Sequence, residues 1–371
     1  MYVVPMQIGD ILELDMQSLA YGGKGVGPYD NHGVPFSIFV SMTVPGDKVK
    51  VKINSVRHRF AEATLLEILT PSPLRIKPLC PYFGMCGGCD WQHVSYGLQL
   101  EEKQKQVAAI FKHYQLANVL KIIPSKQFGY RDRARFHKNN SALGLMQRSS
   151  NKILDIKKCI VSSEVINEQL RVLRLGCDIS GSLDLATSSV IPLPEFGLML
   201  HFYEPCFTQQ SFTQNQILVK TVLQFLDLKI TDVVLDLFSG IGNFSLPAAR
   251  FVKAVIGVEG VKVAVKAAIE NAVSHQIRNV SFKTAGVLQW LKSSKVGADK
   301  IIIDPPRDGL GDAARFLNGV CAKKIVYVSC DLRSLSRDLR LLKNYDVVRV
   351  QPIDMSPQTY HVETVVELIR K

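Results

Sequence analysis

The chain has 371 residues, 47% of them apolar, which is enough for two or three domains with hydrophobic cores. Its net charge is +12, and the basic excess is concentrated in residues 1–160. This asymmetry favours a polyanion-binding half beside a near-neutral catalytic half, with a merely solvated basic surface as the alternative. The sequence shows no apolar run long enough for a membrane span and no signal-peptide pattern, and its eight cysteines suit a reducing compartment. A cytoplasmic protein that acts as a monomer is therefore expected.

Residues 1–69 alternate short apolar runs with glycine- and proline-rich turns. Strands are predicted at Ile8–Leu14, Val34–Val40, Lys48–Ile53 and Ala61–Leu69. The segment Tyr-Gly-Gly-Lys-Gly-Val-Gly-Pro is predicted to be a turn. So many short strands are typical of a small barrel of the oligonucleotide-binding type. Lys48, Lys50 and Lys52 alternate along one strand, so they share a face that we expect to bind RNA phosphates, unless it is simply solvated.

Residues 70–205 are predicted to form a β-rich central domain that opens with a proline-bearing linker. An amphipathic helix is expected over residues 99–114, where it could pack on the catalytic domain. Arginines alternate with other residues in Tyr130-Arg-Asp-Arg-Ala-Arg-Phe136, so on a strand they would share one face. Arg131 and Arg133 are therefore predicted to contact single-stranded nucleic acid. Two buried rings beneath a charged face are the alternative.

The cysteines fall into three groups. Those at ligand spacing form C-x5-C-x2-C in CPYFGMCGGCDW with a fourth further on: Cys80, Cys86, Cys89 and Cys159. Thiols crowded in this way usually hold a metal or an iron–sulfur cluster, and tetrahedral zinc is the alternative. Cys177, Cys206 and Cys321 have no partners at ligand spacing and are expected to be ordinary buried thiols. Cys330 stands alone in Tyr-Val-Ser-Cys-Asp.

From about residue 216 the pattern becomes strand–helix–strand, which predicts a doubly wound α/β sheet with right-handed crossovers. The catalytic domain is placed at residues 206–371. Its strands are predicted at Val233–Asp236, Ala254–Glu259, Val280–Phe282, Lys300–Ile303, Lys324–Ser329, Tyr345–Val350 and Glu363–Ile369.

Two loops of this domain indicate a cofactor. Asp236-Leu-Phe-Ser-Gly-Ile-Gly-Asn-Phe244 follows the first strand, and its glycines allow close approach of a ligand at the carboxyl ends of the strands. Glu259 ends the next strand, where a carboxylate can accept hydrogen bonds from ribose hydroxyls. The spacing is not that of a dinucleotide fingerprint and favours S-adenosylmethionine. Asp304-Pro-Pro-Arg307 forms a stiff loop without the aromatic residue that amine methyltransferases carry there, which leaves it free to bind the cofactor and a flipped base.

Cys330 follows a predicted strand at the sheet edge where α/β enzymes place reacting groups. A thiolate there could add to C6 of uracil and make C5 nucleophilic enough to accept a methyl group. A base must then remove the C5 proton. Glu363, which begins the last strand, is the predicted base, and His361 is the second candidate.

Together these motifs resemble the RNA uracil-5-methyltransferase family over nearly the whole chain. The resemblance implies an N-terminal RNA-binding TRAM barrel, a [4Fe–4S] cluster on the cysteine quartet, and a C-terminal class I methyltransferase domain. It also implies Cys330 as nucleophile and Glu363 as general base. The implied S-adenosylmethionine ligands are Gln209, Phe238, Asn243, Glu259 and Asp304. The barrel and quartet resemble the ribosomal-RNA members, so 23S rRNA is the expected substrate and transfer RNA the alternative.

The sequence departs from the family where Asp331-Leu332 follows the nucleophile in place of the usual Asn-Pro. A carboxylate pointing toward the thiol would raise its pKa and slow attack. An inactive RNA-binding assembly factor that keeps the methyltransferase fold is therefore a second hypothesis. A radical enzyme is disfavoured, because it would need C-x3-C-x2-C spacing and an open iron.

Overall fold

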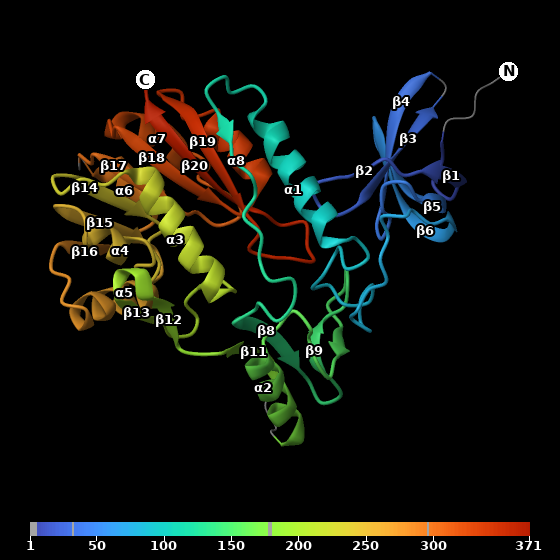
Figure 1. Ribbon diagram of the computed structural model, residues 1–371, viewed down its shortest axis with the longest axis horizontal. Helices are drawn as coiled ribbons and strands as arrows, with labels where there is room; N and C mark the ends of the chain where they lie inside the picture. Colours follow the sequence, from blue (N-terminus) through green and yellow to red (C-terminus); the bar gives the residue numbers. More distant parts are fainter. Residues whose placement is uncertain (1–5, 32, 177–179, 295–296) are drawn as a thin grey trace.

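The computed structural model describes residues 6–31, 33–176, 180–294 and 297–371. Figure 1 shows an N-terminal sheet in blue, a central region in green and a larger α/β region in yellow to red. The long helix α1 (Tyr96–Phe111) lies between the first and the last of these. None of the helices in the described ranges is long and apolar enough to cross a bilayer.

The α/β region is built on one mixed sheet with the strand order β16-β15-β14-β17-β18-β20-β19-β7. Strands β14 to β18 pair in parallel, whereas β20 runs antiparallel to both of its neighbours. The strands are β7 (Asn118–Val119), β14 (Val233–Leu237), β15 (Ala254–Glu259), β16 (Val280–Thr284), β17 (Lys300–Ile303), β18 (Lys324–Ser329), β19 (Tyr345–Ile353) and β20 (Glu363–Arg370). The predicted doubly wound α/β sheet is confirmed, and the short edge strand β7 is an addition to it.

Helices cover both faces of this sheet because its strands are apolar on both sides. On one face pack α3 (Phe212–Leu226), α4 (Ser245–Ala249) and α5 (Lys262–Ser274). On the other pack α6 (Val287–Ser293), α7 (Ala313–Val320), α8 (Leu332–Leu339) and α1. Along β18, Val326 faces the first core and Tyr327 the second, as alternation on a strand requires.

Segments before residue 206 also belong to this body. The helix predicted over 99–114 is observed three residues earlier, as α1, and its Val107 and Phe111 are buried in the second core. The hairpin of β12 (Val190–Leu193) and β13 (Leu198–His201), joined by the 3-10 turn η1 (Pro194–Phe196), packs into the first core. The packed catalytic body is therefore larger than residues 206–371.

The N-terminal sheet has the strand order β1-β5-β6-β4-β3-β2 around its own apolar core. Its strands are β1 (Ile11–Asp15), β2 (Ser18–Leu19), β3 (Gly25–Asn31), β4 (Val34–Val40), β5 (Lys48–Val56) and β6 (Phe60–Thr70). The glycine-rich segment predicted as a turn is a turn only at its start, because β3 begins at Gly25. A Cβ atom at Gly25 would lie 2.0 Å from the Thr43 hydroxyl, so glycine is needed for the close approach of chains rather than for a turn.

The central region holds an antiparallel sheet of order β10-β9-β8-β11. Its strands are β8 (Arg133–Lys138), β9 (Leu143–Met146), β10 (Ile153–Asp155) and β11 (Gly181–Ala186). Helix α2 (Glu164–Leu175), which sequence analysis did not predict, lies at the end of this region (Figure 1). Its N-cap is Ser163, whose hydroxyl accepts a hydrogen bond from the Ile166 amide. The Asn167 side chain bonds both the amide and the carbonyl of Cys159, and so ties α2 to the cysteine quartet.

Candidate active site and cysteine pocket

One large cavity opens at the carboxyl ends of the parallel strands, where ligands bind in doubly wound sheets. Its lining includes every residue that sequence analysis assigned to cofactor binding or catalysis. They are Gln209, Phe238, Asn243, Glu259, Asp304, Cys330 and Glu363. These residues are up to 154 positions apart in sequence, from Gln209 to Glu363. The fold therefore brings them to a single site.

The glycine loop after β14 has the backbone geometry expected of a ligand-binding turn. Phe238, Gly240 and Gly242 all have positive φ, at 63°, 53° and 91°. Such a conformation is costly for a phenylalanine and is typically retained at functional positions. Glu259 fixes the loop, since its carboxylate accepts the Gly240 amide at 3.0 Å and the Val261 amide at 2.8 Å. The buried Ser239 hydroxyl, also in the cavity lining, has no hydrogen-bond partner among the described residues.

Asn243 is held by a partner that sequence analysis had not assigned a role. Its amide and that of Asn215 on α3 exchange two hydrogen bonds, at 2.8 and 2.9 Å. This pair fixes the Asn243 side chain at the cavity wall. The signal in the sequence was the Asn215-Gln216 pair downstream of Gln209, but only the structure shows that Asn215 acts through Asn243.

The catalytic end of the cavity is crowded with acidic groups. Burial, and then the charges of Glu363 and Asp304, raise the pKa of the Cys330 thiol to about 12. Burial raises the pKa of Glu363 to about 7, and burial together with Glu363 raises that of Asp304 well above its ordinary range. Arg307 opposes these shifts for both Cys330 and Glu363. Burial lowers the pKa of His361 to about 4, so this candidate base is neutral near pH 7.

The carboxylate of Asp331 is turned away from the Cys330 thiol. Its Oδ1 accepts the amides of Arg333 and Ser334, both at 2.9 Å, and so caps α8. Its Oδ2 accepts the Tyr21 hydroxyl at 2.9 Å. Burial opposes ionisation, but hydrogen bonds from Ser334, Tyr21 and Arg333 hold the Asp331 pKa below its ordinary value. The thiol pKa is raised by Glu363 and Asp304 across the cavity, and not by its neighbour in sequence.

Two of the cavity residues that were not predicted as site residues, Arg307 and Phe207, carry side chains with a potential role. Arg307 places a positively charged guanidinium in a cavity wall whose other charged groups are the carboxyl groups of Glu259, Asp304 and Glu363. Phe207 also lines the cavity with its ring 77% exposed, which is unusual for a phenylalanine and leaves a face on which a planar base could stack. The sequence signal for Arg307 was its place after Asp304-Pro-Pro. Phe207 lies two residues before Gln209 in a loop without secondary structure, so no periodicity marked it.

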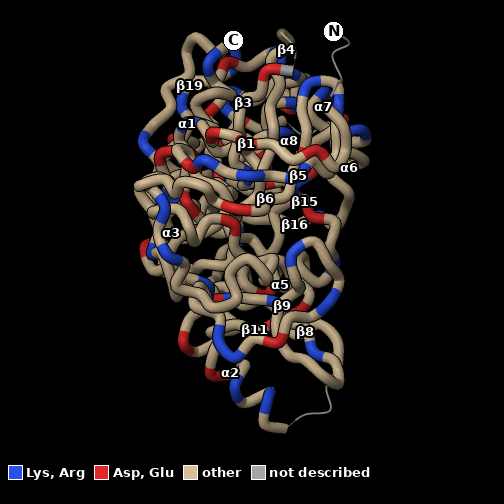
Figure 2. The backbone as a smooth tube through the Cα atoms, turned by 90° about the vertical axis from the view of Figure 1, so that its right-hand side faces the viewer, with Lys and Arg blue, Asp and Glu red and all other residues tan. Residues whose placement is uncertain are grey.

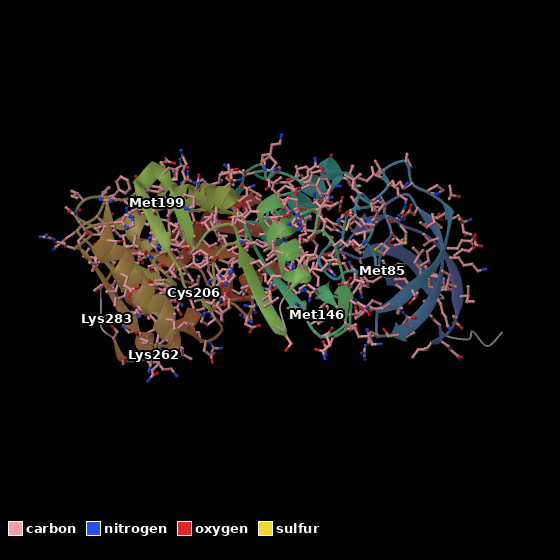
Figure 3. The ribbon with its side chains drawn as sticks, turned by 90° about the horizontal axis from the view of Figure 1, so that it is seen from below. Met85, Met146, Met199, Cys206, Lys262 and Lys283 are labelled. Atoms are coloured by element: carbon pink, nitrogen blue, oxygen red, sulfur yellow. The ribbon has the colours of Figure 1, made fainter. Side chains whose placement is uncertain are left out.

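A second pocket, in the central region, collects the cysteine quartet. Cys80, Cys86, Cys89 and Cys159 line it together with Arg131, Lys158, Gln92 and mostly apolar side chains. Burial raises the pKa of Cys89 to about 12, and raises that of Cys80 and Cys86 as well. The loop that bears three of the thiols pairs with the end of β9, through Gly87 to Met146 at 3.0 Å and Arg148 to Met85 at 2.8 Å. Figure 3 labels Met85 and Met146 on the two sides of this junction.

The quartet does not converge on one point. Among the described residues, no three His, Cys, Asp or Glu side chains form a group that could hold a metal ion. Of the other cysteines, Cys206 is buried as predicted, whereas Cys321 is exposed at the C-cap of α7, so that prediction was wrong. Cys177 lies outside the described residues. Figure 3 places Cys206 in the catalytic body, well apart from the Met85 loop.

The residues predicted to bind RNA lie in different surroundings. Arg131 precedes β8, so the predicted face shared with Arg133 and Arg135 is wrong for Arg131, which lines the cysteine pocket instead. Arg133 donates to the Cys206 carbonyl and, at 3.0 Å, to the Thr208 hydroxyl, next to the active-site cavity. Arg135 is exposed and donates to Asp184 at 2.7 Å.

Lys48 and Lys52 on β5 are exposed and Lys50 is half-buried, while the residues between them are buried. Lys50 lies opposite Glu13 on β1 and Glu67 on β6, and Lys48 forms an ion pair with Glu13 at 3.3 Å. Figure 2 shows basic and acidic segments interspersed across this sheet. The lysine face is therefore a mixed surface and not a continuous basic strip.

Comparison with known proteins shows which family the chain resembles in sequence. A family model for tRNA (uracil-5-)-methyltransferases matches residues 188–371. The chain is 32% identical to a 23S rRNA (uracil(1939)-C(5))-methyltransferase, RlmD, of Histophilus somni, with 94% of each chain covered. It is 30% identical to an RNA methyltransferase of Thermotoga maritima, over 96% of this chain and 99% of that one.

Among solved structures, the fold is similar to that of a Pyrococcus abyssi tRNA (uracil-54, C5)-methyltransferase in complex with S-adenosyl-L-homocysteine. The TM-score is 0.75 with 22% identity, covering 96% of this chain and all of the other. The likeness thus extends from the N-terminal sheet to the catalytic body.

Proposed function

The chain belongs to the RNA uracil-5-methyltransferase family, and from this premise we propose that it methylates C5 of a uridine in 23S ribosomal RNA. The observation that supports the proposal best is the single cavity lined by Cys330, Glu363 and the predicted cofactor ligands. A nucleophilic thiol, a buried carboxyl group and a cofactor loop are the groups that carbon methylation of uracil requires.

S-adenosylmethionine, when bound, supplies the methyl group. The cavity suits it, since the unpartnered Ser239 hydroxyl and the Glu259 carboxylate both lie in its wall. We propose Gln209, Phe238, Asn243, Glu259 and Asp304 as its ligands. A carboxylate for ribose hydroxyls and a glycine loop at the sheet edge are the features with which such sheets bind adenosine-bearing ligands.

The residues act in a fixed order. Cys330 adds as a thiolate to C6 of the flipped uracil, which makes C5 an enolate carbon that accepts the methyl group. Glu363, in its ionised form, then removes the C5 proton, and the Cys330 thiolate is expelled. The neighbouring guanidinium of Arg307 favours the ionised form of both groups. The exposed ring of Phe207 offers a stacking surface for a nucleobase outside its helix.

Trapping the covalent adduct tests this mechanism. RNA containing 5-fluorouridine should form a stable adduct with the protein and cofactor, because fluorine at C5 leaves no proton for Glu363 to remove. Cys330→Ala should abolish both the adduct and formation of 5-methyluridine. Cys321→Ala is the matched control, because this exposed thiol lies outside the cavity lining and should leave both unchanged. Methylation by Cys330→Ala would refute the mechanism, and an unreactive wild-type protein would favour the inactive assembly-factor hypothesis.

The choice of ribosomal RNA rests on the relatives. RlmD relatives at about 30% identity match nearly the full chain, whereas the transfer-RNA enzyme from Pyrococcus abyssi is 22% identical. Mass-spectrometric mapping of 5-methyluridine in a deletion strain should show its loss from 23S rRNA. Loss from transfer RNA alone would instead establish the alternative substrate.

We also propose that the cysteine quartet holds a [4Fe–4S] cluster. Arg131 is the observation in its favour: its side chain lines the pocket, its Nε is buried without a hydrogen-bond partner, and no carboxylate among the described residues forms an ion pair with it. A buried cation needs a counter-charge, and a cluster with four thiolate ligands is anionic. Cluster ligands bind separate iron atoms, so they need not converge as ligands of one zinc ion do. This agrees with the absence of a single-ion site in the described parts of the chain.

The cluster would act as a structural brace, because all of its ligand positions would be filled by cysteine. It would join the 80–89 loop to the segment before α2, and so fix the central region beside the cavity.

The N-terminal sheet is proposed to be a TRAM-type barrel that grips RNA. The side chains of Leu14 and Met16 on one side of its core approach Gly27 of β3 on the other, as in a closed small barrel. Lys48 and Lys52 are its exposed cations for phosphate contacts, with Arg133 nearer the cavity. We propose that the protein does this as a monomer.

A further inference from the structure

A turn of the N-terminal sheet region reaches the segment that carries the nucleophile. Tyr21 precedes Gly22 and Gly23, which have φ values of 109° and 86°. A Cβ atom at Gly23 would lie 3.1 Å from the Tyr360 ring, and the positive φ of this residue also favours glycine. The Trp91 indole donates to the Gly23 carbonyl at 3.0 Å and holds the turn in place.

The Tyr21 hydroxyl makes two hydrogen bonds to the residues that follow Cys330. It donates to Asp331 Oδ2 at 2.9 Å and accepts the Leu332 amide at 3.3 Å. Because Asp331 Oδ1 caps α8, the two bonds join the turn, the cap and the nucleophile segment into one unit.

Both bonds depend on the residues in which this chain departs from its family. A proline at 332 would have no N–H to donate to the hydroxyl. An asparagine at 331 that kept its oxygen on the helix cap would present an NH2 group to Tyr21, so the hydroxyl could only accept from it and not donate as it does to Asp331. Asp331 and Leu332 therefore each supply one half of the contact in its present form.

The Tyr21 ring also touches the segment before the general base. The Tyr360 ring meets it edge-on, at 5.4 Å between centroids and 83° between planes, and the Arg333 guanidinium lies 5.4 Å from its centre. Tyr360 in turn stacks at 4.2 Å on His361, which lines the cavity. One side chain outside the catalytic body thus contacts both segments that carry the reacting groups.

We propose that Tyr21 is a positioning residue that fixes the Cys330 segment and holds the Asp331 carboxylate away from the thiol. This couples the proposed RNA-gripping sheet to the nucleophile, and it rests on the proposed function in taking Cys330 as the reacting group. Without the hydroxyl, Asp331 Oδ2 becomes free to turn toward a thiol that already faces Glu363 and Asp304, with Arg307 as the opposing cation. Asp331 also accepts the Arg333 amide, and the Arg333 guanidinium lies over the Tyr21 ring.

A double-mutant cycle tests the proposal. The variants are Tyr21→Phe, Asp331→Asn with Leu332→Pro, and all three changes together. The control is Tyr203→Phe, which removes a tyrosine–carboxylate bond of 2.9 Å to Glu270 on the surface. For each variant we would measure the rate of adduct formation at saturating 5-fluorouridine RNA, the RNA dissociation constant, and the pH profile of Cys330 alkylation by iodoacetamide, read from its peptide.

Tyr21→Phe should slow adduct formation about tenfold, shift the alkylation profile to higher pH and leave RNA affinity within about twofold. The Asn-Pro variant should slow adduct formation similarly but leave the alkylation profile unshifted, because asparagine brings no charge near the thiol, and the triple variant should be no slower than either. Multiplicative slowing, or weaker RNA binding with an unchanged rate at saturation, would overturn the proposal. If the wild type forms no adduct, the proposed function fails. The alkylation profile, which needs no RNA, then still decides the role of Tyr21: an unshifted profile of Tyr21→Phe overturns it.

Discussion

A buried ion pair ties helix α1 to the segment that leads to the general base. Lys103 on α1 and Asp354 are both 0% exposed, and Nζ lies 2.7 Å from Oδ1. The ammonium also donates to the Ser356 carbonyl at 3.1 Å, and the Tyr96 hydroxyl donates to Asp354 Oδ2 at 2.9 Å. Asp354 follows β19, and the chain then runs through His361 to Glu363. The pair therefore supports one wall of the active site.

Lys103→Met keeps most of the length of the side chain and removes its charge. Asp354 would keep only neutral donors, from Tyr96 and the Ser356 amide. Removing one partner of a fully buried pair leaves an uncompensated charge, so we expect a loss of about 3–5 kcal/mol in the free energy of unfolding.

Urea unfolding, followed by circular dichroism, measures this loss. Lys105→Met on the same helix is the control: the Lys105 side chain is largely exposed, so its pair with the buried Glu102 should contribute at most about 1 kcal/mol. Lys103→Met/Asp354→Asn should be more stable than Lys103→Met, since it removes the stranded charge. The reasoning is refuted if Lys103→Met costs no more than Lys105→Met.

The active-site cavity and the cysteine pocket each lead to one further prediction. Burial raises the pKa of Glu363 to about 7, and the base acts in its ionised form. Where removal of the C5 proton from the Cys330 adduct limits turnover, kcat should therefore rise about tenfold per pH unit below pH 7 and level off above it. A kcat that does not change with pH over this range would contradict Glu363 as the base. Cys159→Ser should lower the iron and acid-labile sulfide of anaerobically purified protein, whereas Cys321→Ser should not. Bound zinc in place of iron would reject the cluster.

Local periodicity predicted the catalytic sheet well. Of its strands, β15, β17 and β18 were predicted with the observed bounds, because apolar runs in parallel strands are buried on both faces and stand out from their helices. Strand β3 was missed because its glycines mimic a turn, and they are needed instead where chains approach closely. The two-residue strand β7 has no pattern of its own, since it is defined by pairing with β19.

The sequence by itself determined the chemistry: which thiols are crowded, which cysteine stands alone, and which loop can approach a cofactor. These features depend only on residue type and spacing, so they can be recognised from the sequence alone. The tertiary structure decided which way side chains point and what charge surrounds them. Arg131 belongs to the cysteine pocket, and Asp331 faces Tyr21 instead of the thiol, because both orientations depend on partners distant in sequence. A hydrogen bond across 310 residues leaves no local pattern, so it could be found only in the folded chain.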